Sequence, residues 1–190
     1  MADAGPFPVI RTERLLLRAF TAGDAPDVER LAGAREVAST TLNIPHPYPE
    51  GTADGWIAGQ EEARRRGAAI VFAITQREGG DLIGAISMRI DQANDRAEIG
   101  YWIGVPYWGS GYGTEANIAV VDYAFCTLRL NRVHAYHFKR NPASGRVLQK
   151  SGMAYEGRLR KHVRKLDAYE DLEIYGVLAA EWMKPQPPSR

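Results

Sequence analysis

The stretch WGSGYGT, residues 108–114, decides the fold of this 190-residue chain. It places three glycines between an apolar segment that ends at Val105 and a segment with helical periodicity. Glycines let a backbone turn tightly and bring successive N–H groups close to a ligand. A helix that starts there adds unpaired amides and the positive end of its dipole. The stretch therefore predicts a phosphate- or pyrophosphate-binding loop, although a Gly-rich turn without a ligand has the same composition.

Two well-known nucleotide-binding loops do not match this stretch. A Walker A loop needs Gly-Lys followed by Ser or Thr, and no Lys occurs here. A dinucleotide fingerprint needs two residues between its second and third glycine, whereas Gly111 and Gly113 are separated by one. Both readings are excluded.

The segments on either side of the loop have clear periodicities. Residues 69–75, 82–90 and 97–105 are predicted to form three strands of a meander before the loop. Residues 114–128 place Thr114, Ile118, Val121, Phe125 and Leu128 on one face of a helix after it. The remaining predicted elements are a strand over 14–20, helices over 21–31 and 52–66, a strand over 132–138, a short helix from Asn141 to about Gly152, and strands over 153–163 and 168–180. The order is βααβββαβαββ, an α/β (α+β) chain.

The loop and these elements together resemble the GNAT superfamily of acetyl-CoA-dependent N-acetyltransferases. In that family a Gln/Arg-x-x-Gly-x-Gly/Ala segment binds the pyrophosphate of CoA. Trp108, Gly111 and Gly113 stand at the matching positions, and Trp108 departs from the usual Gln or Arg. Further stretches look like the RimJ/RimL-like branch, whose members include ribosomal-protein N-terminal acetyltransferases: TERLLLR (12–18), IGYWI (99–103), GTEA (113–116), NPAS (141–144), GM (152–153) and EG (156–157).

The resemblance implies a mixed, mostly antiparallel, splayed sheet flanked by helices. One N-acetyltransferase domain would span residues 9–183. Residues 1–8 would be a loose N-terminus and the Pro-rich residues 184–190 a disordered tail.

The resemblance also implies a binding site for acetyl-CoA. Backbone groups of Ile103 and Val105 would pair with the pantetheine arm as an added strand does, and Asn141 would hydrogen-bond the same arm. Arg146 and Lys150 are placed to meet the phosphates. The loop residues expected to hold the pyrophosphate are Gly109, Ser110, Gly111, Tyr112, Gly113 and Thr114.

Acetyl transfer needs a proton donor for the departing thiolate and a way to deprotonate the amine. Many family members carry a donor Tyr where this chain has Leu148, whereas the RimJ/RimL-like branch uses a Ser, here Ser144. Glu98 is the first choice for the base, the alternatives being an ordinary surface pair with Arg89 or Arg96, or proton loss to water. The position of a known base in that branch is occupied by Val163.

The acceptor site is expected to involve the last strand and an aromatic wall. Asp171 would hold a substrate ammonium, and Tyr169 and Trp102 would line the pocket. An ordinary surface strand pair and a core aromatic residue are the alternatives. No metal site is expected.

The net charge of the chain is +1, which argues against a nucleic-acid coat or a polybasic membrane binder. The charge is unevenly distributed, because residues 129–165 hold eleven Lys/Arg and one acidic residue, Glu156, leaving −9 for the rest. The basic part would border the cofactor phosphates, and the acidic remainder would suit a cationic amine. Cys126 lies in an apolar run and is expected to be buried.

The sequence thus predicts a cytoplasmic acetyl-CoA-dependent N-acetyltransferase, a monomer or homodimer. Its acceptor would be a protein N-terminus or a small amine that attacks directly in a ternary complex. The alternatives are a non-catalytic acyl-CoA-binding sensor, an antibiotic or polyamine acetyltransferase, and a nucleic-acid-binding module built on the basic run 158–165. Neither a nucleic acid nor a membrane is an expected partner.

Overall fold

A computed structural model describes residues 5–182 and contains one eight-stranded sheet with the order β1-β2-β3-β4-β5-β6-β8-β7. All neighbouring strands are antiparallel except β5 and β6, which are parallel. The strands are β1 (Ile10–Arg11), β2 (Leu15–Arg18), β3 (Ala69–Gln76), β4 (Leu82–Asp91), β5 (Arg96–Ile103), β6 (Arg132–Phe138), β7 (Ala154–Lys165) and β8 (Ala168–Leu178). The mixed, mostly antiparallel sheet predicted from the sequence is confirmed.

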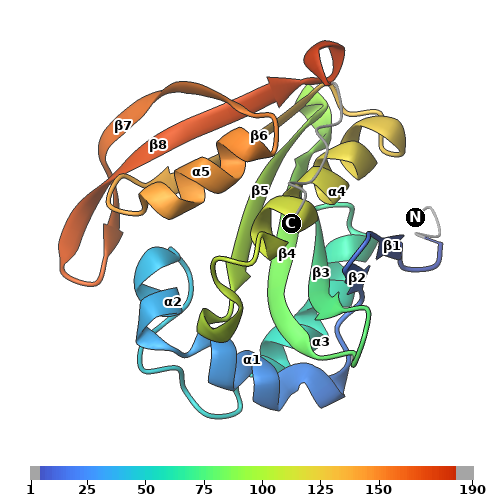
Figure 1. Cartoon of the computed structure of the whole chain (residues 1–190), viewed down its shortest axis with the longest axis vertical. Coiled ribbons are helices and arrows are strands. Elements are labelled where there is room, and N and C mark those ends of the chain that lie inside the picture. Colours follow the sequence, from blue (N-terminus) through green and yellow to red (C-terminus); the bar gives the residue numbers. More distant parts are fainter. Residues whose placement is uncertain (1–4, 183–190) are drawn as a thin grey trace.

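The sheet divides at the parallel pair. The ladder between β5 and β6 runs only from Arg96–Arg132 to Ile99–Ala135, although both strands continue beyond it. Past that point the strands diverge, so β1–β5 and β6–β8 form two arms (Figure 1). The splayed edge of β5 therefore has backbone groups without a strand partner.

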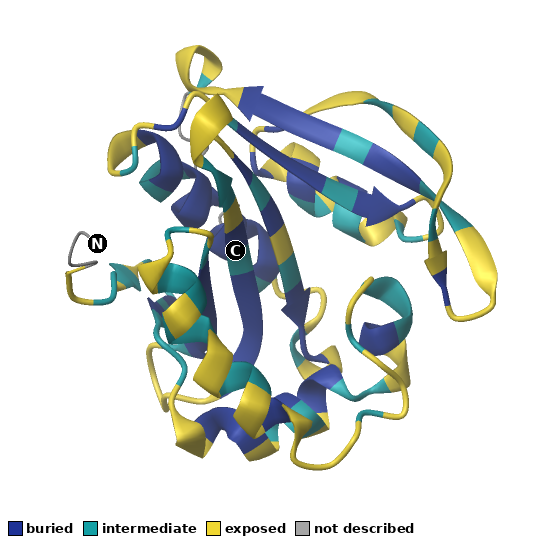
Figure 2. Cartoon of the chain, turned by 180° about the vertical axis from the view of Figure 1, so that it is seen from behind, coloured by how far each residue is buried: buried dark blue, intermediate teal, exposed yellow. Residues whose placement is uncertain are grey.

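Helices cover both faces of the sheet. On one face lie α4 (Tyr112–Cys126) and α5 (Pro142–Lys150), one over each arm, and on the other lie α1 (Ala25–Ala32) and α3 (Thr52–Arg65), with α2 (Arg35–Thr40) beside the open end (Figures 1 and 2). The main core joins β2–β6 to α4, with Phe72, Ile86 and Val120 fully buried. A second core packs α1 and α3 on β3–β5 and includes Trp102.

The helix after the Gly-rich loop differs from its prediction. It begins at Tyr112, and its residues 113–121 are all buried, so it is enclosed on nearly every side instead of showing one apolar face. Two short elements, β1 and α2, were not predicted. The expected burial of Cys126 is wrong, because its position at the end of α4 leaves it exposed.

The strand before the loop also ends earlier than predicted. β5 stops at Ile103, and residues Val105–Tyr107 form a 3-10 turn in place of the last strand residues. At the N-terminus, Phe7 packs edge-on against Phe72 with ring centroids 5.3 Å apart. This contact ties the end of the expected loose segment to the core, while residues 1–4 and the expected tail 184–190 lie outside the described residues.

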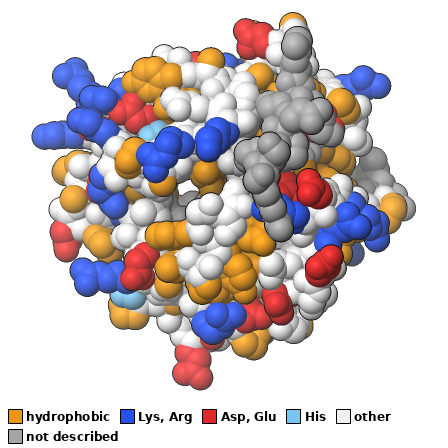
Figure 3. Space-filling view, viewed as in Figure 1, with side chains coloured by type: hydrophobic (Ala, Val, Ile, Leu, Met, Phe, Trp, Pro, Cys, Tyr) orange, Lys and Arg blue, Asp and Glu red, His pale blue; other side chains and the backbone are white. Residues whose placement is uncertain are grey.

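Basic side chains gather over the β7–β8 hairpin and α5, at the upper left of the space-filling view (Figure 3). Several of them are paired: Arg132 with Glu156, Arg140 with Glu170 and Arg158 with Glu173. Within residues 5–182, no helix is long and apolar enough to cross a membrane, and no group of three or more potential metal ligands occurs.

Candidate active site

The Gly-rich loop presents unpaired amides at the start of α4. Gly109 and Gly111 have φ values of +77° and +80°, in the left-handed region that favours glycine. Gly111 caps the helix, and the N–H groups of Tyr112, Gly113 and Thr114 find no acceptor among the described residues. A Cβ on Gly113 would lie 3.3 Å from the Tyr101 ring, so the backbone approaches β5 closely here. This geometry is suited to binding an anion.

A buried ion pair holds this loop from behind. Glu115, only 4% exposed, lies in the first turn of α4 and forms an ion pair with Arg14 at 2.6 Å. It also accepts hydrogen bonds from the Thr12 hydroxyl and the Arg14 backbone N–H, at 2.6 and 2.9 Å. Arg14 in turn donates through Nη1 to the carbonyl of Ser110 at 2.8 Å. The pair therefore neutralises an acid that would otherwise oppose an anion at the helix start.

Trp108 contacts the two β5-edge residues expected to pair with pantetheine. Its indole Nε1–H donates to the carbonyl of Ile103 at 2.6 Å, and its backbone N–H donates to the carbonyl of Val105 at 3.2 Å. The ring is 48% exposed beside the Gly-rich loop. Trp108, unusual at this family position, therefore hydrogen-bonds the Ile103 carbonyl. The resemblance assigns the backbone of Ile103 to the cofactor arm.

Ser144 connects the start of α5 to β5. It lies in the first turn of α5, where its N–H donates to Oδ1 of Asn141 at 3.3 Å. Its hydroxyl lies 3.0 Å from the hydroxyl of Tyr101 on β5. Burial raises the pKa of Tyr101 to about 12, so this phenol stays protonated at neutral pH and can donate to Ser144. Sequence reasoning did not assign Tyr101 a catalytic part.

Leu148 is fully buried one turn after Ser144, as a core residue. Arg146 and Lys150, on the exposed side of the same helix, form no ion pair among the described residues. Their neighbour Val147 lies 3.8 Å from the Cβ position of Gly113, which places α5 beside the Gly-rich loop. The two cations are thus free to meet phosphates near the Gly-rich loop.

Glu98 lies on β5 in an ion pair with Arg89, with Oε1 2.5 Å from Nη2. The structure thereby shows the surface pair that was the alternative to a base. The guanidinium occupies one of the carboxylate oxygens. His134 lies opposite Glu98 in the parallel ladder, and its buried Nδ1 has no hydrogen-bond partner in the described chain. Burial lowers the pKa of His134, which favours its neutral form.

Of the three residues expected at the acceptor site, Tyr169 and Asp171 lie on one face of β8, whereas Trp102 lies in the second core. Trp102 is 9% exposed and belongs to the core beneath α1. Tyr169 is 68% exposed, and Asp171 accepts a hydrogen bond from the backbone N–H of Lys161 at 2.9 Å. Asp171 therefore stabilises the bulge of β7, where Lys161 has a φ of +48°.

A cavity beside β8 is instead lined by Ala168 and Glu170, which alternate with Tyr169 and Asp171. Because side chains alternate along a strand, the sequence could have predicted that Ala168 and Glu170 share a face of β8. Nothing in the sequence indicated that α2 lines the cavity, because that helix was not predicted.

Residues 14–154 match the family model described as "Acetyltransferase (GNAT) domain". The chain is 32% identical to "Uncharacterized N-acetyltransferase YoaA" of Bacillus subtilis (strain 168), over 90% of this chain and 97% of that protein. It is also 32% identical to "Ribosomal-protein-serine acetyltransferase" of Escherichia coli (strain K12), over 63% of this chain and 66% of that protein. A solved structure, "Crystal structure of Probable acetyltransferase", is similar with a TM-score of 0.82 and 27% identity, covering 92% of this chain and 99% of that one.

Proposed function

The chain belongs to the GNAT family of acetyltransferases, and we propose that it transfers the acetyl group of acetyl-CoA to a primary amine, either a protein N-terminal α-amine or the amine of a small molecule. The observation that carries this proposal is the set of three unpaired amides at Tyr112, Gly113 and Thr114 beside the divergence of β5 and β6. An anion bound at these amides would place its extended arm along the free edge of β5.

The residues present fit CoA. The positive φ values of Gly109 and Gly111 and the closeness of Gly113 to Tyr101 form a cradle that a side chain would fill. Arg146 and Lys150 add positive charge on the neighbouring helix. Asn141 uses Oδ1 to cap α5, which leaves the two N–H groups of its amide for the arm.

Acetyl-CoA supplies the electrophilic thioester carbonyl and a thiolate leaving group. Ser144 would give its hydroxyl proton to that thiolate, and Tyr101, protonated and 3.0 Å away, would resupply the proton. The amine forms the new C–N bond as the C–S bond breaks and loses one proton. An α-amine with a pKa near 8 is partly neutral at pH 7, so water can take this proton. Glu98 on β5 and His134 on β6 are the side chains proposed as alternatives to water as the base.

The acceptor class is supported by similarity to a ribosomal-protein-serine acetyltransferase. The departures at Leu148 and Val163 keep a non-catalytic acyl-CoA-binding protein as the alternative.

The test of the proposal is a thermal-shift titration with acetyl-CoA followed by an amine and peptide screen for thiol release. At a hundredfold excess over Kd, binding stabilises the fold by about 2.7 kcal/mol, or a rise in Tm of about 5–10 °C. No rise at millimolar acetyl-CoA would refute the proposal, and a rise without thiol release would favour the sensor.

Replacing Ser144 with Ala is expected to lower kcat about 100-fold and to change the KM for acetyl-CoA less than threefold. The lost proton donor acts only at the departing thiolate, and the effect lies at the low end of general acid catalysis because a thiolate leaves readily. Steady-state kinetics with a good acceptor measure this. Tyr101→Phe, which keeps Ser144, is the companion variant and should lose less. Turnover of the Ala variant within twofold of the parent would remove Ser144 from the mechanism.

Acetyl-CoA binding is expected to change the tryptophan emission of the protein, and Trp108→Phe is expected to abolish most of that change. The Trp108 indole is half exposed and is bonded to the β5 carbonyl that the cofactor arm would approach. A fluorescence titration measures the change, and Trp56→Phe, altered in the core beneath α1, should retain it. An unchanged signal in the Trp108 variant would place this ring outside the binding site.

A further inference from the structure

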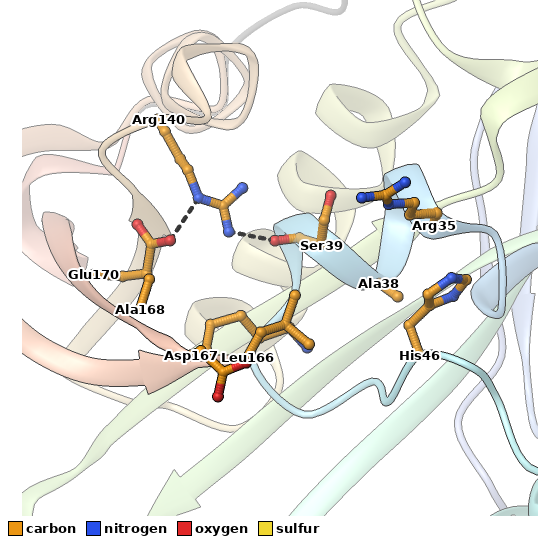
Figure 4. A pocket seen from close by; sticks show the side chains of 10 residues that line it. Arg35, Ala38, Ser39, His46, Arg140, Leu166, Asp167, Ala168 and Glu170 are labelled. Atoms are coloured by element: carbon orange, nitrogen blue, oxygen red, sulfur yellow. Dashed lines mark hydrogen bonds and ion pairs between the residues drawn. The ribbon is translucent and has the colours of Figure 1, made fainter.

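A cavity of 480 Å³ opens between α2, the loop after it and the tip of the β7–β8 hairpin. Arg35 and His46 line it from one side, and Arg140 and Glu170 from the other (Figure 4). Arg140 links the walls, because it donates to the Ser39 carbonyl at 2.6 Å and to Glu170 at 2.7 Å. The volume lies in the range of sites that hold small ligands or the end of a peptide.

One lining residue of this cavity lies close in sequence to the transfer site that we propose. Arg140 directly precedes Asn141, the residue that caps α5, and Ser144 lies in the first turn of that helix. One helical turn therefore separates a cavity wall from the hydroxyl assigned to the thiolate. An acceptor whose amine reaches Ser144 can place its neighbouring groups in the cavity.

The acids of the cavity are already compensated. Glu170 accepts the hydrogen bond from Arg140, so the two charges cancel locally. Asp167 has a fully exposed side chain and lies 3.5 Å from Arg164. Neither carboxylate is left to attract a cationic ligand.

Two cations of the cavity lack an acidic partner. The ammonium of Lys165, a residue only 7% exposed, donates to the carbonyls of Leu42 and Ile44 at 3.2 and 2.6 Å and forms no ion pair within residues 5–182. Arg35, the first residue of α2, has an exposed guanidinium with neither a hydrogen bond nor an ion pair in the described chain. The cavity therefore carries excess positive charge.

We propose that this cavity binds a carboxylate of the amine acceptor, so that the acceptor is a peptide or amino acid with an acidic group close to its reactive amine, and not a polyamine. The inference rests on the proposed acetyl transfer and adds the chemical class of the acceptor. Arg35 binds the carboxylate through its planar pair of N–H groups, and Lys165, held by the carbonyls of the loop after α2, adds a second positive charge. A polyamine meets repulsion from both. The acceptor charge proposed here is negative, whereas the acidic remainder of the sequence led us to expect a cationic acceptor.

The test compares acceptors that differ only in charge. A peptide amide beginning Ala-Asp is paired with one beginning Ala-Asn, free alanine is paired with alaninamide, and spermidine is the cationic probe. Within each pair, the acceptor that carries the carboxylate is expected to have a kcat/KM about tenfold higher than its amide partner. One charge-assisted hydrogen bond provides a free energy of this size. Preference within the peptide pair assigns the carboxylate to a side chain, and preference within the alanine pair assigns it to a free amino acid.

Arg35→Gln should remove most of the preference and leave the KM for acetyl-CoA unchanged. Arg66→Gln is the matched control, because Arg66 is also exposed at the end of a helix and lies 3.7 Å from Glu62, far from the cavity lining. Affinities of the same peptides for the CoA-saturated protein, measured by calorimetry, give the answer even without turnover. Three results would overturn the inference. They are equal rates and affinities within both pairs, a preference for the acid that survives Arg35→Gln, and a preference for spermidine. Failure of the proposed function is distinct, since acetyl-CoA would then either not raise the Tm or raise it without thiol release from any acceptor.

Discussion

Gly111→Asp is expected to weaken CoA binding by about 200-fold while leaving the protein folded. Gly111 has a φ of +80° and caps α4 next to the unpaired amides of residues 112–114. An Asp there costs about 1 kcal/mol in backbone strain. Its carboxylate, about 5 Å from a bound phosphate, adds roughly 3 kcal/mol of repulsion at an effective dielectric constant of 20. The strain lowers the stability of the free and the bound protein alike, so the repulsion alone sets the loss of affinity. It corresponds to a little over two decades in Kd, which calorimetric titration with CoA measures.

Gly80→Asp is the matched control for this variant. Gly80 has a φ of +77° in the turn between β3 and β4, with no atom within 4 Å of its Cβ position. It therefore carries the same strain and charge without a place in the cradle. Its CoA affinity should equal that of the parent. A folded Gly111 variant whose Kd stays within threefold of the parent would show that the pyrophosphate binds elsewhere.

The local patterns of the sequence predicted most of the elements because those patterns are themselves local. Helix α3 was predicted over 52–66 from its i,i+4 pairs and Gly67, and it ends at Arg65. β6 was predicted with its observed bounds from apolar spacing alone. The helix α2 was missed because only Val37 and Ala38 of its six residues are buried, too few to show a period. It is a helix because of its tertiary environment.

The candidate site shows the same division. The Gly-rich turn and the start of α4 follow from glycine and helix chemistry, so the sequence was enough to predict the geometry of residues 109–114. The Arg14–Glu115 pair joins residues 101 positions apart, and no local pattern indicates such a contact. Tyr169 and Asp171 were assigned to the acceptor site because the last strand commonly lines that site in the family branch that the sequence resembles. Ala168 and Glu170, which alternate with them along β8, line the cavity instead.

The net charge counted over residues 129–165 overestimates the positive charge available there, because acids from other elements pair with some of the arginines. Residues 129–165 carry +10 in the sequence, yet Arg132, Arg140 and Arg158 are paired with acids. Two of these acids, Glu170 and Glu173, come from β8, outside the counted segment. The basic residues without an acidic partner in the described chain include Arg146 and Lys150 on α5 and Lys165 in the cavity.

Glu115→Ala is expected to destabilise the fold by about 3–5 kcal/mol, the usual cost of removing one partner of a buried ion pair. The carboxylate is 4% exposed and binds the Thr12 hydroxyl, the Arg14 N–H and the Arg14 guanidinium. Its removal leaves these donors without an acceptor, and the Arg14 side chain is only 20% exposed. Urea unfolding measures the loss, which amounts to a fall in Tm of about 10 °C.

Glu62→Ala supplies the control, because its carboxylate is 63% exposed and lies 3.7 Å from Arg66 in a surface pair. A change below about 0.5 kcal/mol is expected there. If Glu115→Ala costs no more than this control, the Arg14 pair does not stabilise the fold.

CoA affinity separates the role of the Arg14–Glu115 pair from that of the cradle itself. Arg14 holds the Ser110 carbonyl at 2.8 Å, so losing Glu115 should loosen the loop and lower both stability and affinity. Gly111→Asp should lower affinity far more than stability. Arg14→Ala added to Glu115→Ala should cost little further stability, since the two residues act as one unit. A fully additive double variant would mean that Arg14 holds the loop independently of Glu115.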